Sequence, residues 1–510
     1  MASSIFHLLP FDKRHRTLPL VCRRWHALVA ASPELRRQAE LFLPSRRVLT
    51  GLSALAAWLR PGAAADVQAI VLQLQAPLLP VDDSSGAACA GGGPRSAASG
   101  GEEQQAGEAL AAALADLLAA CSGPSVALCQ LDLQLEAVPL VITDQLAAAL
   151  ASVPRLQRLS ISLHRYGGLR LAAPLAGLPA LQELSLSARR DAMQPLRPGG
   201  PALPENAALQ ARCQQRGRQY CGGGGAGATS EGALAVGLEL AALPRLHSLS
   251  LQGLRLPAQG YAPLARLPAL RRLRLGRCRC HPSPACLAQL STLEELHLEG
   301  GSPPATALSQ FGSHPHGPDD EPDWRKAASR QLAQTLAHLP AMGGSLRRLV
   351  LTGHLSGLSA ADLAPLAELC GLASLCIWQE AAAPSSSDRS NSGEEAASVA
   401  ALPGGAWLSG LCQLAAPAQC LAGCQGFMRG ASRLEGLAMQ GCSAADAAWL
   451  ADLLRWAAAH PVLRRLCLDL PASPEQLAAQ GGSQAAGVGL LGRPGMVKRG
   501  DALACQMCTF

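Results

Sequence analysis

The fold of this chain is decided by a short motif that is clearest at residues 293–298, which read Leu293-Glu294-Glu295-Leu296-His297-Leu298. Its spacing is Leu-x-x-Leu-x-Leu. The last two leucines are separated by one residue, as expected for a strand whose side chains alternate between two faces. The same spacing recurs along most of the chain. Copies begin at Leu128, Leu156, Leu181, Leu246, Leu270, Leu293, Leu346, Leu372, Leu434 and Leu463, and a degenerate copy begins at Val67.

The first leucines of successive copies are mostly 23–29 residues apart, which is the length of one structural repeat. An apolar helical stretch precedes most copies and ends near a proline or glycine. Examples are 360–369 before Gly371 and 444–459 before Pro461. We therefore expect each unit to contain a strand, a turn, a helix and a second turn. One such unit cannot bury its leucine face alone, so stacked units are needed for a continuous core.

This pattern resembles the leucine-rich-repeat family, whose motif continues with Asn or Cys three residues after the last leucine. Cys278 and Cys442 occupy that position in two copies, and other copies carry Leu254, His164 or His354 there. The resemblance implies an α/β solenoid, a horseshoe with the strand side chains between the leucines on its concave side.

Composition divides the chain into four expected parts. They are an N-terminal helical module at 1–47, a cap or linker at 48–127, the repeat array at 128–470 and a disordered tail at 471–510. Segments rich in Gly, Pro, Ser or acidic residues predict disordered insertions on the array. These insertions are expected at 81–107, 188–230, 300–326 and 380–400.

The N-terminal module carries a motif of its own, Val21-Cys22-Arg23-Arg24-Trp25 followed by Leu28. Leu18, Val21, Trp25 and Leu28 recur at intervals of three and four residues, which is typical of an apolar helix face. The flanking sequences are Ile5-Phe6-x-x-Leu9-Pro10 and Pro33-Glu34-Leu35.

This segment resembles an F-box, the helical module that docks a receptor onto the Skp-type adaptor of a cullin–RING ubiquitin ligase. The resemblance implies that the Skp-type adaptor and the cullin are partners. It also implies a set of adaptor-binding residues, namely Leu9, Pro10, Val21, Cys22, Trp25 and Leu28. From the residues alone, two other interpretations stay open: a helical cap for the first repeat, and a basic helix that binds RNA or a membrane.

Charge and composition argue against several other classes of protein. The chain has 43 basic and 37 acidic residues, and the excess of six lies within residues 1–47. A chain-wide nucleic-acid surface is not expected, because phosphate binding needs a concentrated basic face. Residues 1–10 lack the basic start of a secretory signal, and no run of 18 apolar residues predicts a membrane span. Eighteen scattered cysteines then favour free thiols in a reducing, cytoplasmic or nuclear compartment, with the axoneme as the alternative.

No motif for catalysis or for a cofactor is found. The pair Cys505-x-x-Cys508 has no second pair to complete a zinc site, and His314-Pro-His316 lies in a predicted insertion. The chain has no P-loop, no G-x-S-x-G and no G-x-G-x-x-G after a strand. We therefore expect a binding protein that is not an enzyme and has no metal or cofactor.

The expected function is that of a substrate receptor in a Skp–cullin–F-box type ubiquitin ligase, with a target protein held on the concave face. Mixed charges in the middle copies and one late tryptophan mark the expected target site. Its residues are Arg272, Arg274, Glu295, His297, Glu299, Arg348 and Trp378. The alternative is a leucine-rich-repeat scaffold, for instance cytoskeletal or axonemal, with no ligase role.

Overall fold

The computed structural model describes nineteen stretches of the chain, and they fall into two compact units that are treated separately. Unit 1 comprises the described residues up to Leu270, and unit 2 those from Arg271 onward. The described stretches are 37–43, 47–59, 66–75, 99–122, 126–136, 140–164, 169–171, 177–189, 243–253, 261, 264–276, 284–299, 323–353, 358–379, 400–422, 424, 426–442, 447–468 and 496–497.

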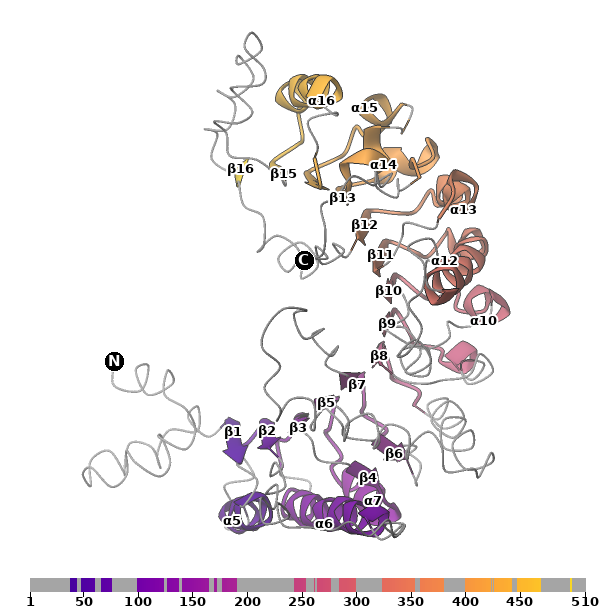
Figure 1. The fold of residues 1–510 in the computed structure, drawn as a ribbon. Helices are drawn as coiled ribbons and strands as arrows, with labels where there is room; N and C mark the ends of the chain where they lie inside the picture. The colour runs from indigo at the N-terminus through magenta and orange to yellow at the C-terminus, as the bar shows by residue number, and fades with distance from the viewer. Residues whose placement is uncertain are drawn as a thin grey trace, which may run out of the picture. The chain divides into compact units, whose positions relative to one another are not determined.

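Unit 1 is built on a parallel sheet with helices along one side (Figure 1). The strands follow one another in the order β1 (Gln38–Leu43), β2 (Ala69–Gln75), β3 (Gln130–Glu136), β5 (Arg158–His164), β7 (Glu183–Arg189) and β8 (Ser248–Gln252). The helices are α5 (Val48–Leu59), α6 (Ser99–Ala120) and α7 (Asp144–Ala151). A separate parallel pair is formed by β4 (Leu140–Ile142) and β6 (Leu169–Leu171).

Unit 2 repeats the same plan with shorter helical segments. Its parallel strands are β9 (Arg272–Gly276), β10 (Glu295–Glu299), β11 (Arg348–Gly353), β12 (Ser374–Gln379), β13 (Gln413–Pro417), β14 (Gly436–Gln440), β15 (Arg465–Leu468) and β16 (Met496–Val497). Its α-helices are α10 (Pro284–Ala288), α12 (Asp323–Leu336), α13 (Ala360–Leu363), α14 (Ala418–Ala422), α15 (Phe427–Gly430) and α16 (Ala447–Ala459). Its 3-10 helices are η6 (Leu339–Met342), η7 (Ala364–Glu368) and η8 (Ala406–Gly410).

A hydrogen-bond pattern repeated at the start of the strands sets their register. The carbonyl oxygen of Arg271 accepts from the amide nitrogens of Glu294 at 2.8 Å and Glu295 at 2.9 Å. The carbonyl of Glu294 in turn accepts from Arg347 and Arg348. The same double acceptance recurs in unit 1, where the Gln157 carbonyl accepts from the amides of Gln182 and of Glu183, the first residue of β7. Within each of the two units, each repeat is thus joined to the preceding repeat at an equivalent residue, and the leucines fall in register.

The leucines of successive strands form continuous buried rows as a result. In unit 2, Leu296 of β10 pairs with Leu273 of β9 on one side and Leu349 of β11 on the other. All three are at most 1 % exposed. Unit 1 has the equivalent row, Leu131, Leu159, Leu184 and Leu249. The core therefore lies between the sheet and its helices, as the motif predicts.

Local sequence explains where several elements begin and end. Helix α7 starts at the N-cap Thr143, whose hydroxyl accepts a hydrogen bond from the Leu146 amide at 3.2 Å, and it buries Leu146 and Leu150, one helical turn apart. The chain leaves β11 through Gly353, with φ of 109°, and leaves β14 through Gly441, with φ of 66°. Both angles favour glycine because it has no Cβ.

The last helix of unit 2 is held by aromatic contacts and by one histidine. Trp456 of α16 lies 5.6 Å, centroid to centroid, from Phe427 and 4.7 Å from His460. The Nδ1 atom of His460 accepts from the Leu463 amide at 3.1 Å, and Nε2 lies 3.0 Å from the Ala431 carbonyl. His460 thereby joins the end of α16 to the turns that precede β14 and β15.

The structure confirms an α/β leucine-rich-repeat architecture and adds copies at both ends of the array and within it. Residues 38–43, which we assigned to the N-terminal helical module, form β1 and pair in parallel with β2. Among the described residues, the first strand of the array therefore begins at Gln38, ahead of the predicted start at 128. A further copy lies at β13, where Leu411 and Leu414 are followed by Ala416 in place of a third leucine.

The edges of the predicted insertions also shift. Helix α6 begins at Ser99, inside the predicted 81–107 insertion. Strand β7 extends into the start of the predicted 188–230 insertion, and α12 includes the end of the predicted 300–326 insertion. Strand β16 lies in the predicted tail and pairs with β15. The remaining insertion and tail residues lie outside the described part of the chain. Among the described residues, every helix is too short or too polar to cross a membrane.

The copy at β13 can be tested with two neighbouring substitutions. Leu414 is fully buried, whereas its neighbour Gln413 is partly exposed on the other side of the strand. We expect Leu414→Ala to lower the free energy of unfolding by about 2–5 kcal/mol, because it leaves a cavity in the leucine row. Gln413→Ala should change it by less than about 0.5 kcal/mol. Urea unfolding followed by circular dichroism measures both, and equal effects would contradict the register.

Candidate functional site

The side of the sheet opposite the buried leucines is the candidate site, and we call it the open face. In Figure 1 the helices α10, α12 and α13 lie on the other side of strands β9–β12. Because side chains alternate along a strand, every second residue reaches the open face. These are the positions that the sequence predicted to line a concave surface.

Register arranges the open-face residues of unit 2 in three rows that run across the strands. The first row contains Arg272, Glu295, Arg348, Ser374, Gln413, Gly436 and Arg465. The second contains Arg274, His297, Val350, Cys376, Ala415, Ala438 and Cys467. The third contains Gly276, Glu299, Thr352 and Trp378.

All seven residues predicted to bind a target therefore lie on the open face of four consecutive strands, β9 to β12. They occupy adjacent positions in the three rows, so the structure brings them together in one unit. The six residues predicted to bind an adaptor, Leu9 to Leu28, lie outside the described residues. The structure thus places the predicted target site and does not describe the predicted adaptor site.

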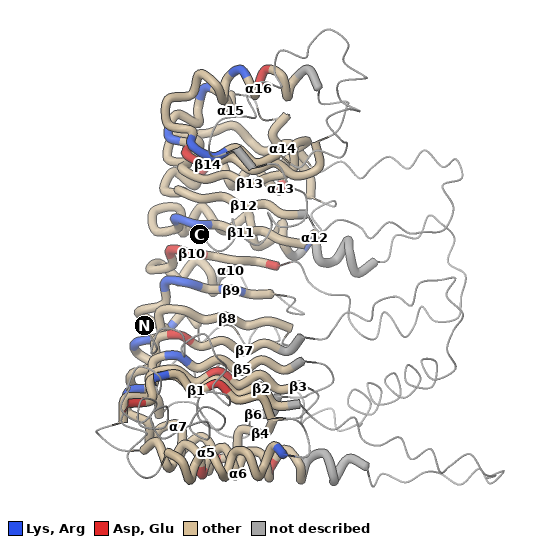
Figure 2. Tube along the Cα trace, turned by 90° about the vertical axis from the view of Figure 1, so that its left-hand side faces the viewer, with Lys and Arg blue, Asp and Glu red and all other residues tan. Residues whose placement is uncertain are grey.

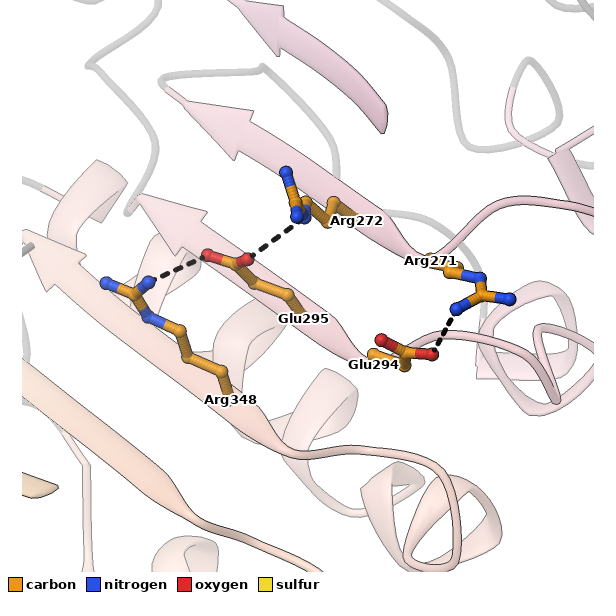
Figure 3. Close-up of polar contacts among 5 residues, drawn as sticks. All are labelled: Arg271, Arg272, Glu294, Glu295 and Arg348. Carbon is orange, nitrogen blue, oxygen red and sulfur yellow. Dashed lines mark hydrogen bonds and ion pairs between the residues drawn. The ribbon is translucent and has the colours of Figure 1, made fainter. Parts of the chain in front are cut away.

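An ion-pair ladder crosses the first row (Figure 3). Glu295 lies between two arginines: Arg348 Nη1 is 3.4 Å from Glu295 Oε1, and Arg272 Nε is 3.7 Å from Glu295 Oε2. The Arg348 side chain is only 18 % exposed, whereas that of Arg272 is 65 % exposed. The ion pair of Glu295 with Arg348 is therefore the stronger of the two, because an exposed pair such as that with Arg272 contributes at most about 1 kcal/mol.

A second pair lies beside this ladder, one residue earlier in the chain. Arg271 Nη1 is 3.1 Å from Glu294 Oε1, and both side chains are largely exposed. Figure 2 shows the resulting alternation, with basic segments on β9 and β11 and acidic ones on β10. The two signs are therefore interleaved along this part of the face.

His297 lies in the second row between the ladder and the third row. Its Nε2 atom is 3.3 Å from the Thr352 hydroxyl oxygen. Burial, together with the guanidinium groups of Arg274 and then Arg348, lowers the pKa of His297 to about 3. The ring is therefore neutral near pH 7, and this part of the face owes its positive charge to arginines alone.

Beyond β10 the second row becomes apolar and buried. Its members Val350, Cys376, Ala415, Ala438 and Cys467 are 2–8 % exposed and form one cluster. The sequence placed four of them at concave positions but missed Ala415, because the copy at β13 lacks its third leucine. The sequence signal that could have revealed this buried row is the recurrence of small apolar residues at one position of consecutive copies. The second row therefore exposes little surface to a partner. On these strands a partner would contact residues of the first and third rows, including the half-buried Trp378.

In unit 1, small polar residues recur at one open-face position of β5, β7 and β8. Ser160, Ser185 and Ser250 follow one another in register, and Arg158 Nε pairs with Glu183 Oε2 at 3.2 Å. Phe42 on β1 is an exposed apolar residue, 57 % exposed, which the sequence analysis did not single out. The open-face positions of this unit carry fewer arginines than those of β9–β11.

The described thiols are poor candidates for chemistry. The ten cysteines for which the structure gives a state are all free. Burial raises the pKa of Cys420 to about 12 and those of Cys121 and Cys424 to about 11. A thiol reacts through its thiolate, so these groups are weak nucleophiles near pH 7. Within the described stretches, no three His, Cys, Asp or Glu side chains are grouped so that they could hold a metal ion.

Comparison with known proteins finds no matching family model and no matching curated protein. Among solved structures, a leucine-rich-repeat protein from Leptospira interrogans is similar, with 14 % identity and a TM-score of 0.28, over 72 % of this chain and 77 % of that one. An internalin from Listeria monocytogenes matches with 12 % identity and a TM-score of 0.30, over 90 % of this chain and 93 % of that one. The fold assignment rests on the strand register described above.

The low pKa of His297 predicts an acid-sensitive contribution to stability. Below about pH 6.5 the unfolded chain binds a proton at this residue that the folded chain does not bind until the pH approaches 3. The contribution is therefore present above the unfolded pKa and is lost as the pH falls. At pH 5 the loss should be on the order of 1–2 kcal/mol.

Urea unfolding at pH 7 and pH 5 checks this. His297→Gln should reduce the destabilisation between these pH values, because glutamine does not titrate. His338, which is exposed on the turn after α12, provides the control: His338→Gln should keep the pH dependence of the unmodified chain. Identical behaviour of the two variants would contradict the burial of a neutral His297.

Proposed function

We propose that this chain is a substrate receptor of a Skp–cullin–F-box type ubiquitin ligase, and that it has no catalytic activity of its own. Its N-terminal segment binds the Skp-type adaptor, and the open face of the leucine-rich repeats holds a target protein. The receptor contributes proximity, since it brings the target to the transfer machinery. Such a role places the chain in the cytoplasm or the nucleus.

The observation that carries the target-binding half is the gathering of charged and aromatic side chains on β9–β12. Seven predicted residues from four strands lie on one face, and the ladder centred on Glu295 joins three of them. Alternating charges favour a specific orientation of a partner more than they add affinity. Both signs are present within a few residues, which supports a protein partner over a nucleic acid, whose binding needs a concentrated basic face.

The adaptor-binding half is supported by the sequence alone. The stretch from Val21 to Trp25, with Leu28 and the flanking Leu9-Pro10 and Pro33-Glu34-Leu35, is the segment that resembles an F-box. The array begins at β1, directly after this segment. The segment that resembles a docking module therefore precedes the repeats in the chain.

The second candidate is a leucine-rich-repeat scaffold without a ligase role, such as a cytoskeletal or axonemal adaptor. The open face of unit 2 serves this function equally well, because it requires only a protein partner. What separates the two candidates is whether the first residues of the chain bind the Skp-type adaptor.

Capture of the purified Skp-type adaptor by the full chain tests the ligase role. Trp25→Ala should reduce capture more than tenfold, because loss of a buried tryptophan anchor costs about 3–5 kcal/mol. Trp378→Ala is the matched control, since it removes a tryptophan from the repeats and should leave adaptor capture unchanged. Equal capture by Trp25→Ala and the unmodified chain, with both folded by circular dichroism, would favour the scaffold function.

A further inference from the structure

We propose that the target presents an acidic segment to Arg272 and Arg274 on the open face of β9. This inference rests on the proposed protein-binding role of that face and specifies the chemistry of the partner. The anionic group is a carboxylate or a phosphorylated side chain within a protein segment, and the two guanidinium groups bind it.

The first argument is the uneven way in which Glu295 is shared. Arg348 is both closer to this carboxylate and less exposed than Arg272. If Arg272 turns toward a ligand, Glu295 therefore keeps a charged partner and is not left as an uncompensated carboxylate. Arg272 gives up only an exposed contact at 3.7 Å, and such contacts contribute little to stability. Arg272 can thus bind an anion at small cost to the sheet.

The second argument concerns Arg274, two residues further along the same strand. Its side chain is exposed, and the residue opposite it on β10 is His297. His297 is half-buried and neutral near pH 7, so the residue directly opposite Arg274 carries no charge. An arginine with an uncharged residue opposite it can direct its guanidinium to a carboxylate or phosphate, with which it forms paired hydrogen bonds.

The two arginines also have a suitable spacing. Residues two apart on a strand lie on the same face with Cα atoms about 6.5–7 Å apart. Long arginine side chains can converge from this separation on one anionic group or on two neighbouring ones. The described open face of β9–β11 carries three arginines and two glutamates. The positive excess lies on β9, whose open-face residues are Arg272, Arg274 and Gly276.

The first unit shows why this arrangement is particular to β9. Arg158 is the arginine at the equivalent first position of β5, and it is 58 % exposed. It pairs with Glu183 at 3.2 Å, a shorter contact than that of Arg272. The next open-face residue on β5 is Ser160, so no second arginine stands beside it. Arg158 is therefore a matched control: a similar exposed arginine without the features that suit an anion.

A displayed library of random twelve-residue peptides, selected on the full chain, tests the inference. The unmodified chain and Arg158→Gln should enrich peptides with Asp or Glu at one or two defined positions. Arg272→Gln with Arg274→Gln should lose this enrichment. Because these arginines are exposed, the variant is expected to fold, which circular dichroism checks. Selected peptides without acidic residues, or acidic enrichment that survives in the double variant, would overturn the proposal.

Synthetic forms of one selected peptide identify the anionic group by fluorescence anisotropy. The peptide is made with aspartate, phosphoserine or asparagine at the enriched position. Binding of the asparagine form should be at least about tenfold weaker, since a charge-assisted hydrogen bond is lost. The tighter of the other two forms identifies carboxylate or phosphate as the group. Equal binding of all three forms would refute an anion site.

Adaptor capture by the same protein preparations separates this inference from the proposed function. If the chain captures the adaptor but selects no acidic peptides, the ligand chemistry is wrong and the ligase role stands. If it selects acidic peptides through Arg272 and Arg274 but captures no adaptor, the anion site stands and the scaffold function replaces the ligase role.

Discussion

The double hydrogen bond at the start of most described strands is the interaction on which the other features depend. One carbonyl, such as that of Arg271, accepts from two successive amides of the next repeat, Glu294 and Glu295. This contact sets the parallel register, and a shift of one residue would turn every leucine to the open face. With the register set, leucines stack into buried rows behind the sheet and the residues between them stack into rows on the open face. Core and binding face are therefore two consequences of one backbone pattern.

The open face of unit 2 changes character along the strands because each repeat contributes one residue to each row. In the first row, arginine, glutamate and arginine follow one another on β9, β10 and β11 and form the ladder around Glu295. In the second row, charge gives way to small apolar side chains from Val350 onward. A repeat protein can thus place distinct chemistry at neighbouring points of one surface by single substitutions at equivalent positions. Interleaved charges of both signs occur on the first strands of unit 2, and Arg465 adds an exposed charge on β15.

His297 illustrates how the stack changes the properties of a single side chain. An isolated histidine titrates near neutral pH, yet here burial and two flanking arginines hold its pKa near 3. Those arginines come from the strands on either side, at residues 23 earlier and 51 later in the chain. The imidazole consequently adds hydrogen-bonding capacity to the face without adding charge, and it leaves Arg274 with an uncharged neighbour.

The sequence by itself determined the repeating unit, the side on which the leucines lie and the seven open-face residues of β9–β12. It could do so because a strand with a period of two and a motif of fixed length leave one arrangement that buries the leucines. It did not reveal the strands at β1 and β13, since Ala39 and Ala416 take leucine positions there and the motif is lost where packing tolerates a smaller side chain. Only the tertiary structure decided that Glu295 is shared unequally, that His297 is neutral and that the second row is buried. Each of these depends on side chains from different repeats, whose distances and exposure are set when the strands stack.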